Sequence, residues 1–307
     1  MISCRSPKTG GEAKIKQPNI LLLLSDDQSF NTINGLGNKE VSTPNIDRLV
    51  SEGTTFTHAH IMGGKTGAIC MPSRAMIMTG KNVLKFNIQG AITSEDETMP
   101  QLLKEAGYVT FGTGKWHNNR DSYAKSFTHG SNIFLGGMSN HLKVPLHDFD
   151  PSGEYPKKNR RFEDKFSSVL FREATVDFLE NYNEEKPFFA FVSFTSPHDP
   201  RMAPKEYEEM FKTEKISLPE NFEPIHPFDN GELIIRDENL LPFPRTEEAV
   251  LGELASYYAM ISEVDDNIGK ILDALEKSGK YENTIIIFAS DNGLAVGQHG
   301  LIGKQSL

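Results

Sequence analysis

Cysteine, basic residues and long apolar runs are all scarce in this sequence, and each scarcity excludes a class of protein. The 307 residues include only two cysteines, Cys4 and Cys70, too few for a scaffold stapled by disulfides. No run approaches the roughly 18 apolar residues of a membrane-spanning helix, so we predict no transmembrane segment. The 42 acidic residues outnumber the 32 basic ones, and the net charge of −10 argues against a nucleic-acid partner.

The N-terminal residues lack the apolar core of a signal peptide. They are polar and basic, so we interpret residues 1–17 as a disordered leader. An alternative is that Cys4 marks the end of a lipoprotein signal whose beginning is missing. We favour an incidental cysteine.

Three short apolar runs predict the strands of a parallel sheet. Residues 19–25, 187–194 and 284–290 are almost continuously apolar, which is typical of strands buried on both faces. A further short strand is predicted at 109–112, and residues 127–161 are predicted to form long surface loops. Helices are predicted at residues 44–53, 72–80, 98–106, 163–182 and 247–277. This order predicts an α/β fold, with a mostly parallel central sheet and helices on both faces.

Each of the three apolar strands is followed by polar residues: Asp26–Asp27, His198–Asp199 and Asp291–Asn292. Ligand sites of open α/β sheets lie at the carboxyl ends of the strands, so we expect these residues to converge. Carboxylates in close proximity are costly unless a cation neutralises them, and oxygen ligands suit Ca²⁺ or Mg²⁺ rather than a metal that prefers thiolates. Asp and Asn are also common in turns for structural reasons, so either pair alone is weak evidence.

The segment Cys70-Met-Pro-Ser-Arg74 is open to two interpretations from its residues alone. Cys70 is a buried structural thiol in the first, because free cysteine is among the most buried residue types. In the second it is a nucleophile whose pKa the neighbouring Arg74 lowers.

A series of motifs makes the sequence resemble the type I, formylglycine-dependent sulfatases of the alkaline-phosphatase-like superfamily. The resemblance covers residues 19–307, and its motifs follow the family order. These are Pro18–Leu21 with Asp26–Asp27, Thr43–Leu49, Gly53–Thr57, Cys70–Arg74, Thr79–Gly80, Gly112–His117, Ser196–His198, Ser290–Gly293 and Gly300–Lys304.

The resemblance implies a nucleophile and a metal site. Cys70 would be converted to formylglycine by a formylglycine-generating enzyme, and its hydrated form would attack sulfur to give a sulfated enzyme intermediate. Calcium, with magnesium as second choice, would polarise the sulfate oxygens. Its ligands would be Asp26, Asp27, Asp291 and Asn292.

The remaining motif residues are implied to act on the aldehyde, the sulfate and the protons. Arg74 would stabilise the hydrated aldehyde, and Lys115 and Lys304 would bind the sulfate as charge develops. His117 would be the base that releases sulfate, and His198 would contact or protonate the leaving oxygen. Outside such motifs, each of these residues is explained equally well as a surface lysine or a structural histidine.

The expected function is therefore hydrolysis of sulfate esters, with a sulfated carbohydrate as substrate. Two alternatives stay open: phosphonate or phosphate ester hydrolysis, and an inactive fragment or glycan-binding pseudo-enzyme. Asp291–Asn292, in place of an Asp-His pair, favours one hard cation over two zinc ions. The resemblance also implies a periplasmic or extracellular location.

The family continues past the final lysine motif into a smaller C-terminal domain, whereas this sequence ends at Leu307. We therefore expect residues 18–307 to be an incomplete catalytic domain. In such a domain, edge strands would expose apolar surface and Lys304 would be poorly held.

Overall fold

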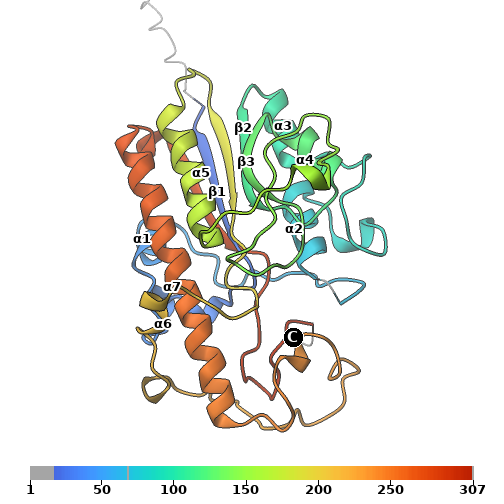
Figure 1. Cartoon of the computed structure of the whole chain (residues 1–307), viewed down its shortest axis with the longest axis vertical. Coiled ribbons are helices and arrows are strands. Elements are labelled where there is room, and N and C mark those ends of the chain that lie inside the picture. Colours follow the sequence, from blue (N-terminus) through green and yellow to red (C-terminus); the bar gives the residue numbers. More distant parts are fainter. Residues whose placement is uncertain (1–16, 68, 306–307) are drawn as a thin grey trace, which may run out of the picture.

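A central sheet of five parallel strands organises the chain in the computed structural model, which describes residues 17–67 and 69–305 (Figure 1). The strand order is β3-β2-β4-β1-β5, and every pairing is parallel. The strands are β1 (Asn19–Ser25), β2 (Val109–Lys115), β3 (His129–Phe134), β4 (Phe188–Ser193) and β5 (Thr284–Ser290). The predicted α/β class is confirmed.

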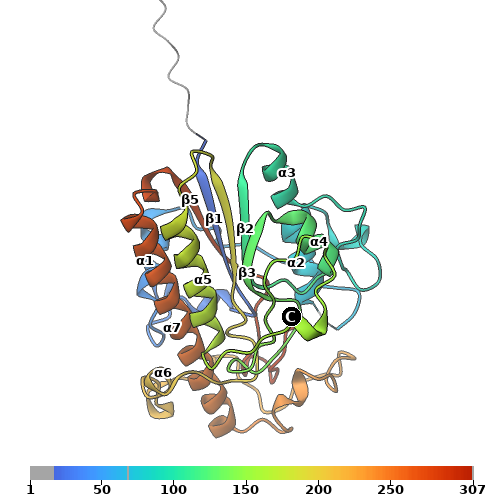
Figure 2. The same cartoon turned by 45° about the horizontal axis from the view of Figure 1, so that its top comes forward.

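Helices cover both faces of this sheet (Figures 1 and 2). Those on one face are α1 (Pro44–Glu52), α5 (Ser167–Asn181) and α7 (Glu247–Lys277), with the single turn α6 (Lys205–Glu208) beside α7. Those on the other are α2 (Cys70–Thr79), α3 (Met99–Glu105) and α4 (Arg120–Ser126). Short 3₁₀ helices are η1 (Phe30–Thr32), η2 (Asn34–Leu36), η3 (Val83–Lys85), η4 (Lys157–Asn159), η5 (Thr213–Lys215), η6 (Glu238–Leu240) and η7 (Tyr281–Asn283).

Successive side chains of β1 belong to two different cores. Leu21 and Leu23 pack in the core under α5 and α7, whereas Leu22 and Leu24 pack with residues of α2. All four are at most 4% exposed. A strand whose alternate side chains are both covered must be apolar throughout, which explains the unbroken leucine run.

The predicted and observed elements differ most in one region. The loop prediction for residues 127–161 is wrong in part, because β3 pairs with β2 at the edge of the sheet. Only its last two residues, Ile133 and Phe134, are aliphatic or aromatic, so no apolar run signalled the strand. Elsewhere the differences are smaller: α2 begins two residues before its predicted start, β2 continues to Lys115, and α4 was not predicted.

The strand β5 is less buried than predicted. It pairs with β1 through all seven residues, but no strand among the described residues pairs with its other edge. Ile285 and Ile287 are 50% and 41% exposed, whereas every residue of the central strand β4 is buried. The prediction of burial on both faces is wrong for β5, and the expectation that an edge strand exposes apolar surface is confirmed.

Predictions about the N-terminus fall almost wholly outside the described residues. Of the predicted leader 1–17 only Gln17 is described, so Cys4 and its lipoprotein alternative cannot be placed. In the described ranges, no helix combines the length and the apolar character that crossing a membrane requires.

Candidate active site

The predicted site residues meet at the carboxyl ends of adjacent strands. Lys115 is the last residue of β2, Asp26 and Asp27 directly follow β1, and Asp291 directly follows β5. The sheet order brings these ends together, and the backbone N–H of Asp27 donates to Asp291 Oδ1 at 3.0 Å across 264 positions of sequence. We call the buried residues gathered here the edge cluster: Asp26, Asp27, Cys70, Arg74, Lys115, Asp291, Asn292 and Lys304.

Cys70 occupies the middle of the edge cluster. It is the first residue of α2, and Pro72 lies in the first turn of that helix, where its missing N–H costs no helical hydrogen bond. The sulfur lies 3.3 Å from Asp27 Oδ1, 3.5 Å from Asn292 Nδ2 and 3.0 Å from Lys304 Nζ. The predicted nucleophile is therefore in contact with two predicted metal ligands and one predicted sulfate-binding lysine.

The thiol of Cys70 is protonated in this environment. Burial and the carboxylates of Asp27 and Asp291 raise its pKa well above the usual value. The Nε of Arg74 donates to Asp291 at 2.8 Å. The raised pKa disfavours the interpretation of Cys70 as a thiolate nucleophile, since the thiol form is a poor nucleophile.

Buried acids and buried cations form three close pairs in the edge cluster, and a longer ion pair of 3.4 Å joins Arg74 to Asp26. The pairs are Arg74 with Asp291 at 2.8 Å, Lys115 with Asp26 at 2.5 Å, and Lys304 with Asp27 at 2.7 Å. All six residues are at most 7% exposed. Charges removed from water are costly to leave alone, so each member of a pair is necessary to the other.

Lys304 is held firmly, contrary to expectation. It is 7% exposed, and its ammonium donates to both carboxylate oxygens of Asp27, at 2.7 and 2.8 Å. The same group contacts Cys70. The expectation of a poorly held Lys304 is therefore wrong, because the turn before it is anchored within the described part of the chain.

The three acids differ in pKa although all are buried. Burial alone would raise the pKa of Asp27, but Lys304 and His198 outweigh it and lower the pKa to about 2. Lys115 and Arg74 likewise outweigh burial and hold the pKa of Asp26 well below its usual value. For Asp291 burial wins, reinforced by the charge of Asp26, and the pKa rises to about 7.

The edge cluster has the chemistry of a cation site. Ligand atoms of Asp26, Asp27, Cys70 and Asp291 all lie within 4.8 Å of one another. Two buried oxygens, Asp26 Oδ1 and Asn292 Oδ1, have no hydrogen-bond partner, and Asp26 Oδ1 lies 3.4 Å from Arg74 Nη2. Buried oxygens that accept no hydrogen bond are suited to a bound positive charge, so these residues fit a hard divalent cation.

A second possible ligand group bears on the choice of metal. It consists of Asp27, Cys70 and His198. Sulfur and nitrogen ligands are those that zinc prefers. The argument for a hard cation therefore rests on the oxygen atoms and on the protonated state of the thiol.

His198 presents one ring nitrogen to the edge cluster. Its Nδ1 lies 2.9 Å from the carbonyl oxygen of Asp199, which can only accept, so Nδ1 carries a proton. Its Nε2 lies 3.6 Å from Asp27 Oδ2. The ring is thereby oriented with Nε2 towards the metal ligands.

His117 lies close to the edge cluster without bonding to Cys70 in the described structure. Its ring packs on Gly137, where an added Cβ atom would collide with Nε2. Burial, Lys115 and Arg74 together lower the pKa of His117 to about 2, so the ring is neutral, and its buried Nδ1 has no partner. His117 and Asp27 both have positive φ, 52° and 68°, and such strained residues cluster at functional sites.

Sequence reasoning missed several side chains that support the edge cluster. Ser193, at the end of β4, accepts a hydrogen bond from Arg74 at 2.5 Å. The hydroxyl of Tyr257, in the middle of α7, donates to the carbonyl oxygen of Asp27 at 2.6 Å. Ser73 donates to the carbonyl oxygen of Asp291. No local signal marks Ser193 or Tyr257, since their partners lie 119 and 230 positions away.

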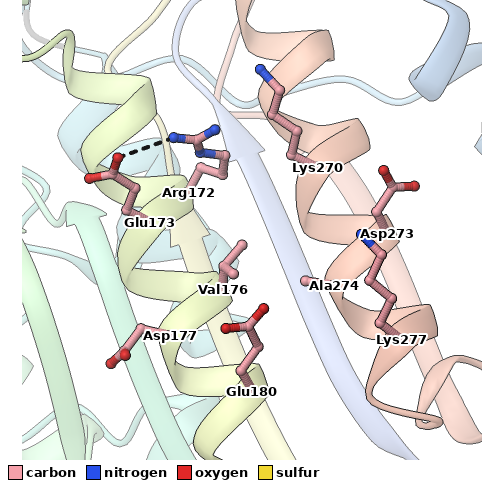
Figure 3. Close-up of a pocket in the computed structure, with 9 residues that line it drawn as sticks. All are labelled: Arg172, Glu173, Val176, Asp177, Glu180, Lys270, Asp273, Ala274 and Lys277. Atoms are coloured by element: carbon pink, nitrogen blue, oxygen red, sulfur yellow. Dashed lines mark hydrogen bonds and ion pairs between the residues drawn. The ribbon is translucent and has the colours of Figure 1, made fainter.

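Two hollows lie outside the edge cluster. The first, about 430 Å³, lies between α5 and α7 (Figure 3). We call it the α5/α7 hollow; it is lined by Arg172, Glu173, Val176, Asp177, Glu180, Lys270, Asp273, Ala274 and Lys277. The second, about 490 Å³, lies near Ser29, Tyr257 and Leu294. Neither is lined by a cysteine or histidine that would suggest a second reaction centre.

Comparisons with known proteins find similar sequences and a similar fold. A model of the sulfatase family matches residues 18–306. A sulfatase from Formosa agariphila is 30% identical, over 100% of this chain and 65% of its own. An N-acetylglucosamine-6-O-sulfatase from Bacteroides thetaiotaomicron is 27% identical, over 99% of this chain and 62% of its own. A solved protein in complex with its substrate D-glucosamine-2-N,6-O-disulfate matches with a TM-score of 0.76 at 24% identity, covering 94% of this chain and 68% of that one.

The parallel sheet with helices on both faces is the α/β fold of this solved protein. By its sequence, the chain belongs to the sulfatase family. It spans about two thirds of the length of the curated relatives named above.

Proposed function

We propose that this chain hydrolyses sulfate esters at the edge cluster, with Cys70 in the form of formylglycine. The observation that carries the proposal is the position of Cys70. Its sulfur lies between an acid of the candidate metal site, Asp27, and a buried ammonium group, Lys304, at 3.3 and 3.0 Å. A nucleophile, a cation site and a sulfate-binding charge are thus adjacent.

The raised pKa of Cys70 supports the modified form. A thiol that burial and carboxylates keep protonated is a poor nucleophile at neutral pH. A hydrated aldehyde at the same position would supply two hydroxyl groups and would need no thiolate. Conversion requires a formylglycine-generating enzyme as a partner during maturation.

The charges of the edge cluster support a divalent cation, for which we propose Ca²⁺ first and Mg²⁺ second. Its three acids contribute −3 and its three cations +3, so a bound divalent ion leaves a net charge of +2. A sulfate ester carries one negative charge and is attracted to such a site. The ion, held by Asp26, Asp27, Asp291 and Asn292, would polarise the sulfate oxygens.

The remaining residues would bind the sulfate and move protons. Lys115 and Lys304, which are held by their acid partners, would bind the sulfate, and Arg74 would orient the hydrated aldehyde. His198, with Nε2 directed into the site, would donate a proton to the leaving alcohol oxygen. The buried Nδ1 of His117 has no hydrogen-bond partner, so it would accept the proton that is lost when sulfate leaves.

A sulfated carbohydrate is the proposed substrate class. The support is that relatives of this chain include an N-acetylglucosamine-6-O-sulfatase and an N-acetylgalactosamine-6-sulfatase. A periplasmic or extracellular location stays a prediction.

The test is sulfate release from a panel of sulfated monosaccharides, an aryl sulfate and an aryl phosphate diester. The chain would be co-expressed with a formylglycine-generating enzyme and assayed with Ca²⁺. We expect turnover of sulfate esters above that of the phosphate diester. Faster turnover of the phosphate diester would establish the alternative activity instead, and no turnover of any ester with Cys70 fully converted would refute the proposal.

A further inference from the structure

We propose that Glu238 is a positioning residue for Lys304, acting through the backbone of the turn that precedes the lysine. The inference rests on the proposed function, because it takes Lys304 as a sulfate-binding group. Glu238 begins η6 and is separated from Lys304 by 66 positions of sequence. It lies in no motif that points to the active site.

Glu238 binds two consecutive backbone amides of the turn. Its Oε2 accepts from the N–H of Ile302 at 2.9 Å, and its Oε1 accepts from the N–H of Gly303 at 2.8 Å. The side chain is 0% exposed, so water does not compete for these bonds. A carboxylate that accepts from two adjacent amides fixes both the position and the orientation of that peptide segment.

Arg245 holds Glu238 and the other side of the same turn. Its Nη2 donates to Glu238 Oε2 at 2.8 Å, and its Nε donates to the carbonyl oxygen of Gly300 at 3.2 Å. Its Nη1 donates to the carbonyl oxygen of Leu241, and the guanidinium lies 3.7 Å from the centre of the Phe243 ring. The turn is thus bound through its amides by Glu238 and through a carbonyl by Arg245.

The turn directly precedes Lys304, whose ammonium group lies in the edge cluster. Gly303 is bound on both sides, since its N–H donates to Glu238 and its carbonyl oxygen accepts from Ala295 at 2.9 Å. The next residue, Lys304, then reaches Asp27 and Cys70. A lysine side chain is long and flexible, so a fixed backbone is what limits the positions open to its ammonium group.

A stabilising role alone is a weak explanation for this buried ion pair. Burying both charges carries a desolvation penalty, and apolar side chains of similar volume are often as stable or more stable. Positioning explains why a charged acceptor, rather than an apolar side chain, faces the two amides.

Asp265 provides a matched control elsewhere in the fold. It is 1% exposed and accepts from the backbone N–H groups of Asn45 and Ile46, at 3.1 and 2.8 Å. This carboxylate therefore holds two consecutive amides as Glu238 does. The segment that it holds is the start of α1, which contains no residue of the edge cluster.

The test is a double-mutant cycle between Glu238→Gln and Lys304→Ala, with 4-nitrocatechol sulfate as the probe. Because a displacement of about 1 Å can cost about 100-fold in rate, we expect Glu238→Gln to lower kcat about 10- to 100-fold. In the Lys304→Ala background it should lower kcat less than twofold, since the group that it positions is gone. The same loss in both backgrounds, or no loss in the native one, would overturn the inference.

Two further variants separate positioning from folding. Asp265→Asn should lower the melting temperature without lowering kcat per folded, aldehyde-bearing molecule. The paired replacement Glu238→Leu with Arg245→Met leaves no buried charge unpaired, although the amides of Ile302 and Gly303 lose their acceptor. Its kcat per folded molecule should still fall about 10-fold or more. Native kcat in the folded pair variant would contradict positioning.

Hydrogen exchange gives a readout that does not depend on turnover. The amides of Ile302 and Gly303 should exchange faster in Glu238→Gln, and should be unchanged in Asp265→Asn. Unchanged exchange in Glu238→Gln would count against the inference. Full activity of Lys304→Ala alone would instead refute the role that the proposed function gives to the lysine.

Discussion

The edge cluster and the α5/α7 hollow contain the same types of charged side chain in different surroundings. In the hollow, Arg172 and Glu173 lie 3.3 Å apart with side chains 19% and 41% exposed, and the Lys270 side chain is 48% exposed (Figure 3). In the edge cluster, the Lys115 and Asp26 side chains lie 2.5 Å apart and are 0% and 1% exposed. Water screens the first set, so its pairs contribute about 0–1 kcal/mol each.

This difference explains why only one of the two groups of charges is suited to chemistry. Buried charges interact strongly, shift pKa values and cannot relax into water, which are the properties that a reaction centre uses. Exposed charges interact more weakly, because water screens them. The comparison therefore predicts that equivalent substitutions will have very different effects in the two regions.

The largest effect should come from Cys70→Ala, which removes the nucleophile at the centre of the edge cluster. We expect sulfate ester turnover to fall by more than about 1,000-fold, as expected when a covalent nucleophile is lost. Turnover would be measured on folded protein beside Lys270→Ala from the hollow, which should keep its activity. Native turnover in purified Cys70→Ala would show that the reaction does not use this residue.

The second largest effect should come from Asp291→Asn, compared with Asp273→Asn in the hollow. Asp291→Asn removes a proposed cation ligand and leaves Arg74 with only its longer ion pair, to Asp26 at 3.4 Å. We expect turnover to fall about 100-fold or more, together with the bound calcium. Elemental analysis would follow the metal, and Asp273→Asn should retain both metal and turnover.

The identity of the ion can be checked in the same samples. A chelator should remove activity, and added Ca²⁺ should restore it. Stoichiometric zinc that is lost on Asp291→Asn would contradict the calcium proposal and favour the ligand group that includes Cys70 and His198.

A smaller effect, on the pH dependence of stability, is expected from replacing Glu263, which is buried without a cation. Burial raises its pKa to about 8, above the usual 4.5, although the Ser168 and Asn267 side chains partly oppose this rise. The folded state therefore binds more protons than the unfolded state between pH 4.5 and 8, and stability falls as the pH rises through this window. A tenfold change in proton affinity corresponds to about 1.4 kcal/mol, so the effect on the unfolding free energy is on the order of a few kcal/mol.

Glu263→Gln should remove that pH dependence, because the amide stays neutral. As the pH rises from 4.5 to 8, the melting temperature of Glu263→Gln should rise relative to that of the native protein. Thermal unfolding at several pH values would measure it. A native-like slope in the variant would show that Glu263 is not the group responsible.

The smallest effect is expected in the α5/α7 hollow. Replacing both Glu173 and Lys270 by Ala should change the unfolding free energy by less than about 1 kcal/mol, and turnover by less than twofold. Chemical denaturation and initial rates would test this. A large loss of turnover would contradict the conclusion that only the edge cluster is suited to chemistry.

The sequence was sufficient to predict the parallel sheet and the meeting of Asp26, Asp27 and Asp291. Continuous apolar runs identify buried strands, and the ends of parallel strands share one edge of a sheet. The roles of the residues were supplied by family resemblance and not by the residues alone. The cationic partners could not be predicted, because a pairing such as Lys304 with Asp27 depends on packing across 277 positions.

Two other features were beyond sequence reasoning for different reasons. The strand β3 lacks an apolar run, since β2 and the loops around it provide its contacts at the edge of the sheet. The pKa of Cys70 depends on the sum of burial and several charges, so the adjacent Arg74 was misleading. Both depend on neighbours that are distant in sequence.

The most direct test of the central claim is the dependence of turnover on the modification of Cys70. Preparations with different fractions of aldehyde at Cys70, measured by mass spectrometry of the peptide that contains it, would be assayed for sulfate release in saturating Ca²⁺. We predict that turnover rises in proportion to the aldehyde fraction and extrapolates to zero when all Cys70 is thiol. Turnover that is independent of the aldehyde fraction, or that is absent at full conversion, would contradict the assignment of the edge cluster as a sulfatase active site.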